Sequence, residues 1–211
     1  MSKIVCISDT HNKHNELIIP ECQILLHAGD FSGRGSIADT KNFLEWFSKQ
    51  PAKYKVFCSG NHDMMDYENP KLFEEILKEY PGVIYLRDEG VELDGVKIWG
   101  RPWTPTFYDW GFMCDRGSPK MLSSLSIIPS DTDILLTHGP AAGILDVTNT
   151  GESVGCYDLL NELERIKPKV MVFGHIHHSS GEVEVNGIKH VNAAVLNDLY
   201  KLTFYPKSFD I

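Results

Sequence analysis

The chain alternates short apolar runs with polar clusters, and the runs have the length of buried strands. Five runs consist mostly of apolar residues, and each is followed within two residues by Gly, Asp, Asn or His. Short apolar runs that end in such residues are typical of buried β-strands. The predicted strands are residues 4–8, 24–27, 54–59, 134–137 and 170–173.

Helical spacing appears between some of these runs. Ser36 is a candidate N-cap, because Asp39 follows it by three residues and an apolar stripe comes next, before Pro51. Two further stripes with helical spacing, residues 72–80 and 159–166, end shortly before a proline. Strands that alternate with helices predict an α/β fold in which most strand pairs are parallel.

Part of the sheet structure is expected to be antiparallel. Residues 91–99 and 182–192 alternate between apolar and polar positions around an Asp-Gly and an Asn-Gly dipeptide, which favour tight hairpin turns. A final strand is expected at residues 199–204. Residues 101–119 combine aromatic side chains with Pro and Gly and show no period, so an irregular aromatic loop is predicted there.

Composition places the chain among ordinary globular proteins. Of its 211 residues 42% are hydrophobic and 23% are charged, and no repeat or linker interrupts them, so one domain over residues 1–211 is expected. The five cysteines form no CxxC motif, which favours reduced thiols and a cytoplasmic location. No apolar stretch approaches the roughly 18 residues of a membrane span, so no membrane association is expected.

The net charge limits the classes of partner that the protein can bind. With 29 acidic and 20 basic residues the formal net charge is −9, which argues against extended nucleic-acid binding, because that needs clustered Lys and Arg. A small phosphate-bearing ligand stays compatible with this charge, because a bound metal ion can reverse the local field. The oligomeric state is left open.

Metal-ligating side chains follow the predicted strands, at the strand ends where α/β sheets bind their ligands. Carboxylate, amide and imidazole groups without thiolates suit Mn²⁺, Fe or Zn²⁺, and seven of them suit two ions that share a carboxylate. Any one histidine alone is more simply structural, but the shared position after five strands favours a metal centre. The blocks are Asp9-Thr-His11, Gly29-Asp30, Gly60-Asn-His-Asp63, Thr137-His-Gly139 and Gly174-His-Ile-His177.

The order of these blocks resembles the signature of the calcineurin-like metallophosphoesterases, D-x-H, GD, GNH[D/E], H and GHxH, over residues 4–192. Pro102-Trp-Thr-Pro105 is similar to a segment of the metallophosphoesterase-domain-containing branch, although His178 stands where that branch usually has Glu. The resemblance implies a sandwich of two mixed β-sheets flanked by helices. It also implies two divalent metal ions, with Mn²⁺ favoured and Fe or Zn²⁺ as alternatives.

The resemblance assigns a role to each polar residue of the blocks. His62 would face the phosphate and the leaving group, and Asp63 would orient or charge-tune its imidazole. The metal ligands would be Asp9, His11 and His177 at one ion, Asn61, His138 and His175 at the other, and Asp30 between the two.

Two residues outside this set are candidate substrate contacts. Arg34 lies on a Gly-rich segment similar to the phosphate-clamping block of Ser/Thr protein phosphatases, with Gly33 in place of an Asp, and a solvated arginine is the alternative. His14 follows His11 closely and could lie at the rim of the site, with an ordinary surface position as the alternative. His27 is expected to be structural, and the aromatic loop could stack a nucleobase or simply fill core.

The function that the resemblance implies is metal-dependent hydrolysis of a small phosphoester, in which two metals share the attacking hydroxide. A phosphodiester is favoured as the substrate, with cyclic nucleotides as the favoured class. The alternatives are a phosphomonoesterase, a protein phosphatase, or a non-catalytic scaffold of the same fold. All seven ligand positions and His62 are intact, which argues for an enzyme.

Overall fold

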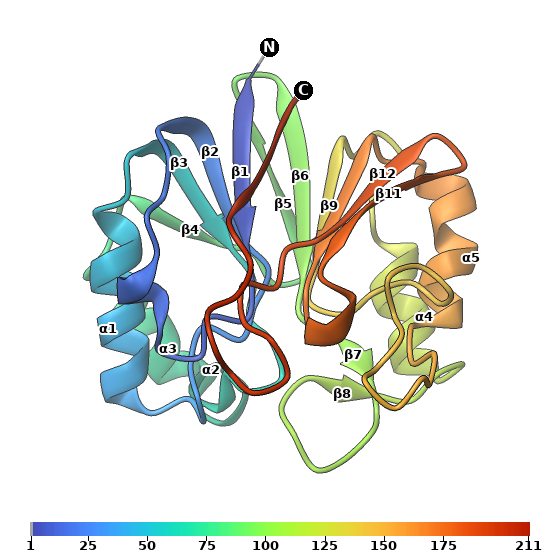
Figure 1. The fold of residues 1–211 in the computed structure, drawn as a ribbon, viewed down its shortest axis with the longest axis horizontal. Helices are drawn as coiled ribbons and strands as arrows, with labels where there is room; N and C mark the ends of the chain where they lie inside the picture. The colour runs from blue at the N-terminus through green and yellow to red at the C-terminus, as the bar shows by residue number, and fades with distance from the viewer. Residues whose placement is uncertain (1) are drawn as a thin grey trace.

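The buried apolar runs form two β-sheets that pack face to face in the computed structural model, which describes residues 2–211 (Figure 1). The core between the sheets contains Ile4, Ile24 and Val56 from one sheet, and Ile134 and Val172 from the other. All five side chains are buried. Helices cover both outer faces, which confirms the predicted sandwich of two mixed sheets flanked by helices.

The first sheet has five strands, and all except one of its neighbouring pairs are parallel. The exception is β13, which runs antiparallel to β1 and pairs Phe209 with Ile4. Across the sheet the order is β13 (Lys207–Asp210), β1 (Lys3–Ile7), β2 (Cys22–His27), β3 (Ala52–Phe57) and β4 (Val83–Tyr85).

The second sheet has six strands, with four parallel strands in the middle and an antiparallel strand at each edge. Each edge strand is one half of a hairpin, and both hairpins turn at the predicted Asp-Gly and Asn-Gly dipeptides. Across the sheet the order is β11 (Gly181–Val185), β12 (Ile188–Asn192), β10 (Val170–Phe173), β9 (Ile134–Thr137), β6 (Val96–Arg101) and β5 (Glu89–Leu93).

The helices bury apolar stripes against the outer faces of the sheets. The first sheet is covered by α1 (Ile37–Ser48), α2 (Met64–Glu68) and α3 (Pro70–Leu77), and the second by α4 (Pro119–Ser126) and α5 (Tyr157–Ile166) (Figure 1). The start of α1 confirms the predicted cap. Ser36 Oγ accepts from the Asp39 amide at 3.0 Å while the Asp39 carboxylate accepts from the Ser36 amide, which satisfies two free donors of the first turn. Two short 3₁₀ turns, η1 (His14–Glu16) and η2 (His177–Ser179), follow β1 and β10.

Two expectations from the sequence are corrected. The final strand is β13, not residues 199–204, because Asn197 Oδ1 accepts from the amides of Leu199 and Lys201, both at 3.0 Å, and makes that segment a turn. The aromatic segment 101–119 is not wholly irregular. It contains the short parallel pair β7 (Thr104–Pro105) and β8 (Met113–Cys114), and Pro119 begins α4.

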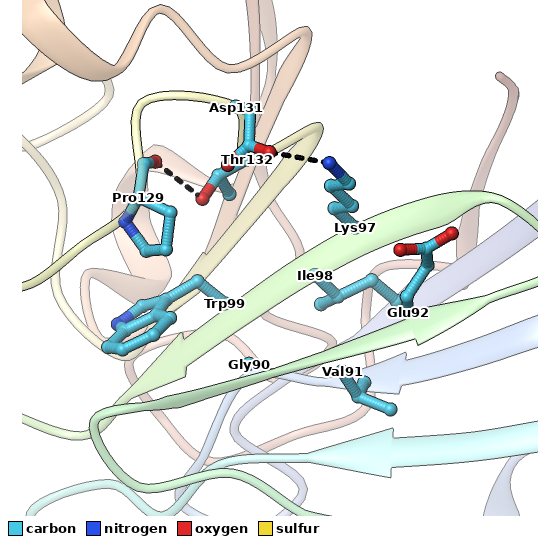
Figure 2. Close-up of a pocket in the computed structure, with 9 residues that line it drawn as sticks. All are labelled: Gly90, Val91, Glu92, Lys97, Ile98, Trp99, Pro129, Asp131 and Thr132. Atoms are coloured by element: carbon cyan, nitrogen blue, oxygen red, sulfur yellow. Dashed lines mark hydrogen bonds and ion pairs between the residues drawn. The ribbon is translucent and has the colours of Figure 1, made fainter.

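An open pocket of about 300 Å³ lies on the outer side of the second sheet (Figure 2). Trp99 and Pro129 form its apolar walls, and an ion pair of 2.5 Å between Lys97 and Asp131 lies at its edge. Its lining contains no strand-end residue of the predicted metal centre within the part of the chain that the structure describes. In the same residues 2–211, no helix is both long and apolar enough to cross a bilayer.

Candidate metal centre

The parallel strands bring the predicted ligands to one end of the sandwich. Residues after β1, β2 and β3 come from the first sheet, and residues after β9 and β10 come from the second. Because the carboxyl ends of both sheets lie at the same end of the molecule, side chains more than a hundred residues apart in sequence meet there. The side chains brought together are Asp9, His11, Asp30, Asn61, His62, His138, His175 and His177.

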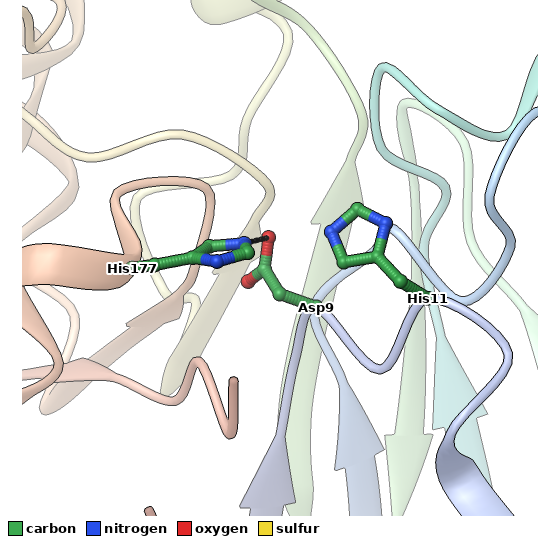
Figure 3. A group of neighbouring side chains, drawn as sticks. All are labelled: Asp9, His11 and His177. Atoms are coloured by element: carbon green, nitrogen blue, oxygen red, sulfur yellow. Dashed lines mark ion pairs between the residues drawn. The ribbon is translucent and has the colours of Figure 1, made fainter. Parts of the chain in front are cut away.

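Asp9, His11 and His177 form the first group (Figure 3), in which one ligand atom of each lies within 4.8 Å of the others. Asp9 Oδ1 is 3.3 Å from His177 Nε2. The Nδ1 atoms of His11 and His177 each lie 3.1 Å from a carbonyl oxygen, of Ser32 and Asn197. A carbonyl only accepts, so hydrogen sits on Nδ1 and Nε2 is left for the centre. His11 Nε2 is buried and has no hydrogen-bond partner among residues 2–211.

Asp30, His138 and His175 form the second group, again within 4.8 Å. His138 Nδ1 lies 2.8 Å from the Ala28 carbonyl, and its Nε2 is 3.3 Å from Asp30 Oδ2 and 2.9 Å from Asn61 Oδ1. Three atoms that bear lone pairs therefore converge on one point, which requires a proton or a metal ion between them. Burial and the charge of His138 lower the pKa of His175 to about 3, so that imidazole is neutral and able to ligate.

Asp30 links the two groups. It also belongs to a third cluster with His11 and His62, and its Oδ2 is 3.8 Å from His11 Nε2. Its Oδ1 accepts from the His62 amide at 2.8 Å, which fixes the carboxylate between the two groups. This is the position that a bridging carboxylate would need.

Buried charge is balanced within the centre. Burial lowers the pKa of His138 and of His177, but Asp30 beside the first and Asp9 beside the second outweigh it and raise both pKa values to about 9. Burial opposes the ionisation of Asp9 and Asp30, yet the same histidines hold the pKa of both carboxyls below the usual range. Two imidazolium protons therefore neutralise two carboxylates in the metal-free protein, and divalent cations can take the place of those protons.

The backbone of the centre is strained in the way that functional sites often are. Asp9, His11, Asp30 and His175 have φ angles of 55°, 39°, 57° and 68°, in the left-handed region. Gly60 lets the backbone approach closely, because a Cβ there would lie 2.3 Å from Asp30 Oδ1. The orphaned His11 nitrogen, the converging acceptors and this close approach together fit a pair of divalent metal ions.

His62 lies beside the centre with its Nε2 free. Its Nδ1 is 2.8 Å from the Gly33 carbonyl, and its ring stacks on Trp110 with centroids 4.2 Å apart. The ring also meets His11 edge-on at 4.7 Å. Within the described chain no hydrogen-bond partner occupies Nε2, which leaves it able to face a substrate.

Of the two roles expected of Asp63, that of orienting the His62 ring is wrong, and that of tuning its charge stays a prediction. All four hydrogen bonds that its carboxylate accepts within residues 2–211 come from the amides of Asp30 and Gly60 and from the amide and hydroxyl of Ser32, at 2.8–3.0 Å. The Gly33 carbonyl, rather than Asp63, holds the His62 ring. Asp63 instead fixes the backbone that carries Asp30. Burial and the charge of Asp30 raise its pKa to about 8.

The two candidate substrate contacts behave differently. Arg34 is exposed, and its guanidinium carbon lies 5.4 Å from the ring centroid of Trp110, near His62. The expected substrate contact of His14 is wrong, because η1 turns this residue under α1 and leaves it fully buried. Its Nε2 is 2.7 Å from Asn42 Oδ1. His27 is structural as expected, buried with its Nε2 3.1 Å from the Thr10 hydroxyl.

Sequence reasoning missed Tyr200, whose ring meets His11 and His177 at centroid distances of 4.9 and 5.4 Å. It belongs to no motif, and only the turn after Asn197 brings it to the centre, so no local pattern could have indicated it. A pocket of about 240 Å³ adjoins the centre here. Its lining is mostly polar and comprises Thr148, Asn149, His175, Ile176, His177, Asp198 and Tyr200.

Comparison with known proteins agrees with this geometry. Residues 2–179 match the family model described as calcineurin-like phosphoesterase. The chain is 35% identical over 232 aligned residues to metallophosphoesterase domain-containing protein 1 of Homo sapiens, an alignment that covers 100% of this chain and 71% of the relative. It is 34% identical over 228 residues to a UPF0046 protein of Caenorhabditis elegans, covering 99% of this chain and 80% of that one.

Solved structures share the fold at low sequence identity. The protein TT1561 of Thermus thermophilus superposes with a TM-score of 0.66 at 11% identity, covering 94% of this chain and 90% of the other. At that identity the likeness concerns the fold alone.

Proposed function

Because this chain belongs to the calcineurin-like phosphoesterase family, whose members are metal-dependent phosphoesterases, we propose that it is a phosphodiesterase acting on small phosphodiesters, with cyclic nucleotides favoured. The observation that carries the proposal is the convergence of two carboxylates, one amide and four imidazoles on two adjoining groups, with Asp30 of the second group 3.8 Å from His11 of the first. The free Nε2 of His62 lies beside them.

The centre fits two divalent ions, with Mn²⁺ favoured. Asp9, His11 and His177 would hold one ion, Asn61, His138 and His175 the other, and Asp30 would be shared. When bound, such ions neutralise phosphoryl charge and lower the pKa of water, so that a nucleophile is available at neutral pH. The chain keeps the ligands in place through hydrogen bonds from ring Nδ1 atoms to backbone carbonyls.

His62 would supply the proton for the leaving group. In the imidazolium form Nδ1–H donates to the Gly33 carbonyl and Nε2–H faces the substrate. As an oxygen of water bonds to phosphorus and the bond to the leaving oxygen breaks, the leaving oxygen takes the Nε2 proton and the electron pair of that N–H bond stays on the ring. The water gives up one proton to solvent, and the neutral imidazole takes one up from solvent. An alkoxide leaving group, such as a ribose hydroxyl, needs this proton most.

The surroundings of the centre support a small substrate. Arg34 would contact the phosphate from the exposed side, since its guanidinium contacts the same indole, Trp110, on which the His62 ring stacks. The pocket of about 240 Å³ beside His175 and His177 offers hydroxyl and amide groups to the rest of the substrate. A pocket of this size suits a nucleotide fragment better than a protein surface.

The test is a comparison of rates on bis-p-nitrophenyl phosphate and p-nitrophenyl phosphate with Mn²⁺-loaded protein, followed by 2′,3′- and 3′,5′-cyclic nucleotides. We expect two metal ions per chain and faster hydrolysis of the diester. Asp30→Asn should lose metal and activity, because the shared ligand is weakened, whereas the matched control Asp131→Asn, at an exposed ion pair, should keep both. A faster monoester would make the protein a phosphomonoesterase, and no hydrolysis with both metals bound would make it a scaffold.

A further inference from the structure

Among residues 2–211, a single hydrogen bond holds the imidazole of His62. Its Nδ1 lies 2.8 Å from the carbonyl of Gly33. That bond limits how far the ring can turn about the bond that joins it to Cβ but does not fix one angle, because terminal torsions of this kind have broad energy wells. Other contacts must therefore decide where Nε2 points.

Two aromatic contacts remove that freedom. The indole of Trp110 stacks on the imidazole with a centroid distance of 4.2 Å and an interplanar angle of 27°. The ring of His11 meets it edge-on at 4.7 Å and 83°. Of these two neighbours, His11 is committed to the metal centre, so Trp110 is the contact whose role is still unassigned.

The loop that carries Trp110 is attached to the block that carries His62. The amide of Gly111 donates to the carbonyl of Asn61 at 3.1 Å. The approach is tight, because a Cβ on Gly111 would lie 3.2 Å from that carbonyl oxygen and 3.2 Å from Met64 Sδ. This backbone contact therefore fixes the position of the indole relative to the imidazole.

The same indole contacts Arg34, whose guanidinium carbon lies 5.4 Å from the ring centroid. Arg34 is exposed and flanked by Gly33 and Gly35, so the cation–π contact is what gives it a defined place. Trp110 thus touches both side chains that would meet the substrate from outside the metal centre.

We propose that Trp110 is a positioning residue: it directs Nε2 of His62 toward the leaving oxygen and holds Arg34 beside it. This rests on the proposed function, because it takes His62 to be the proton donor to the leaving group. The proposal goes beyond that function because the aromatic loop would then help to decide which leaving groups the enzyme accepts, in addition to the strand-end blocks.

The test is a series of aryl phosphodiesters whose leaving phenols range from good to poor, hydrolysed by wild type, His62→Asn, Trp110→Ala and Trp110→Phe. For Trp110→Ala the loss in kcat should grow as the phenol becomes a poorer leaving group, reaching about 10- to 100-fold, the scale of a misplaced catalytic group. His62→Asn should show the same trend more steeply. Trp110→Phe, which keeps a flat ring, should recover most of the loss.

The matched control is Tyr108→Ala on the same loop, whose side chain is 80% exposed; it should match wild type. Metal content should be equal in all variants. A loss in Trp110→Ala that is uniform across the phenols, or accompanied by loss of metal, would overturn the proposal.

The orientation of the His62 ring provides a second measurement that does not depend on activity. Crystal structures of metal-loaded protein should show one ring orientation in wild type and Trp110→Phe, and several in Trp110→Ala. An unchanged ring in Trp110→Ala would overturn the positioning role. If wild type hydrolyses no diester but the ring still loses its orientation in Trp110→Ala, the proposed function fails while the positioning contact stands.

Discussion

The two ends of the sandwich use the same backbone conformation for different purposes. At the end away from the metal centre, the β5–β6 and β11–β12 turns place Asp94 and Asn186 at φ 49° and 52°, each followed by a glycine that also has positive φ. At the other end, Asp9, His11 and His175 lie in the same left-handed region. Paired left-handed residues with Asn or Asp before Gly are what a tight hairpin requires, so the first end is close to unstrained.

The metal end is built differently. Its left-handed residues turn ionisable side chains inward, and Asp9 and Asp30 are 0% and 2% exposed. Burying charge costs free energy that pairing only partly offsets. At the hairpin end, by contrast, both side chains of the Lys53–Asp94 ion pair are in contact with water. Strain and buried charge are therefore concentrated where the ligands must converge, as expected of a site kept for its chemistry rather than for stability.

The largest expected contrast is between one glycine at each end. In Gly60→Ala a Cβ would lie 2.3 Å from Asp30 Oδ1 and 2.6 Å from His138 Cε1, so we expect loss of metal and a fall in kcat/KM of about 100-fold or more. In Gly187→Ala nothing lies within 4 Å of the new Cβ, and its φ of 76° costs roughly 1–2 kcal/mol of stability with metal content unchanged. Metal analysis checks the loss of metal from Gly60→Ala, and thermal unfolding of the metal-free proteins checks the stability of Gly187→Ala. Intact metal binding in Gly60→Ala would contradict the shared role of Asp30.

A change of pH should also affect the two ends differently, because within residues 2–211 the histidines with raised pKa values lie at the metal end. His138 and His177 have pKa values raised to about 9, so at pH 7 both hold a proton that a metal ion must displace. Metal binding at pH 7 should therefore release about two protons, and affinity should rise about 100-fold per pH unit until pH approaches 9, where the effect ends. Calorimetry in buffers of different ionisation enthalpy measures the proton count. Release of no protons would mean that these imidazoles do not ligate.

Local chemistry allowed much of this fold and site to be predicted from the sequence. Residues 134–137 and 170–173 are strands because their side chains are buried on both faces, which leaves an uninterrupted apolar run. The cap at Ser36 involves residues three positions apart, so it too is visible in sequence. The ligand blocks could be recognised because each follows a strand, and the carboxyl ends of parallel strands lie at the same end of a sheet. Residues that follow different strands in sequence are therefore close in space.

What could not be predicted depends on contacts between distant segments. His14 follows a ligand closely, but η1 turns it under α1, where Asn42 and two aromatic rings surround it. Asp63 adjoins His62 in sequence, yet its carboxylate faces the backbone of Asp30. Tyr200 reaches the centre only because a side chain–backbone turn replaces the expected strand. In each case the deciding partner lies in another segment, and periodicity carries no information about it.

The smallest effect is expected at an ion pair of the hairpin end. Asp94 accepts from Lys53 Nζ at 2.8 and 3.1 Å, from Tyr54 Oη at 3.1 Å, and from Gln23, and so joins the two sheets. The side chains of Lys53 and Asp94 are 54% and 35% exposed, and in contact with water side-chain entropy and screening offset most of the attraction. Asp94→Asn removes the charge and keeps a residue that tolerates positive φ, so we expect Tm to change by no more than about 2 °C, with metal content and kcat unchanged. Water does not screen the buried pair of His138 and Asp30, which are 3.3 Å apart. The attraction within an ion pair is therefore strong at the metal end and weak at the hairpin end. Unfolding scans of wild type and Asp94→Asn at low and high salt provide the measurement. A large drop in Tm that is the same at both salt concentrations would contradict this expectation, because it would show that Asp94 makes a large and unscreened contribution to stability.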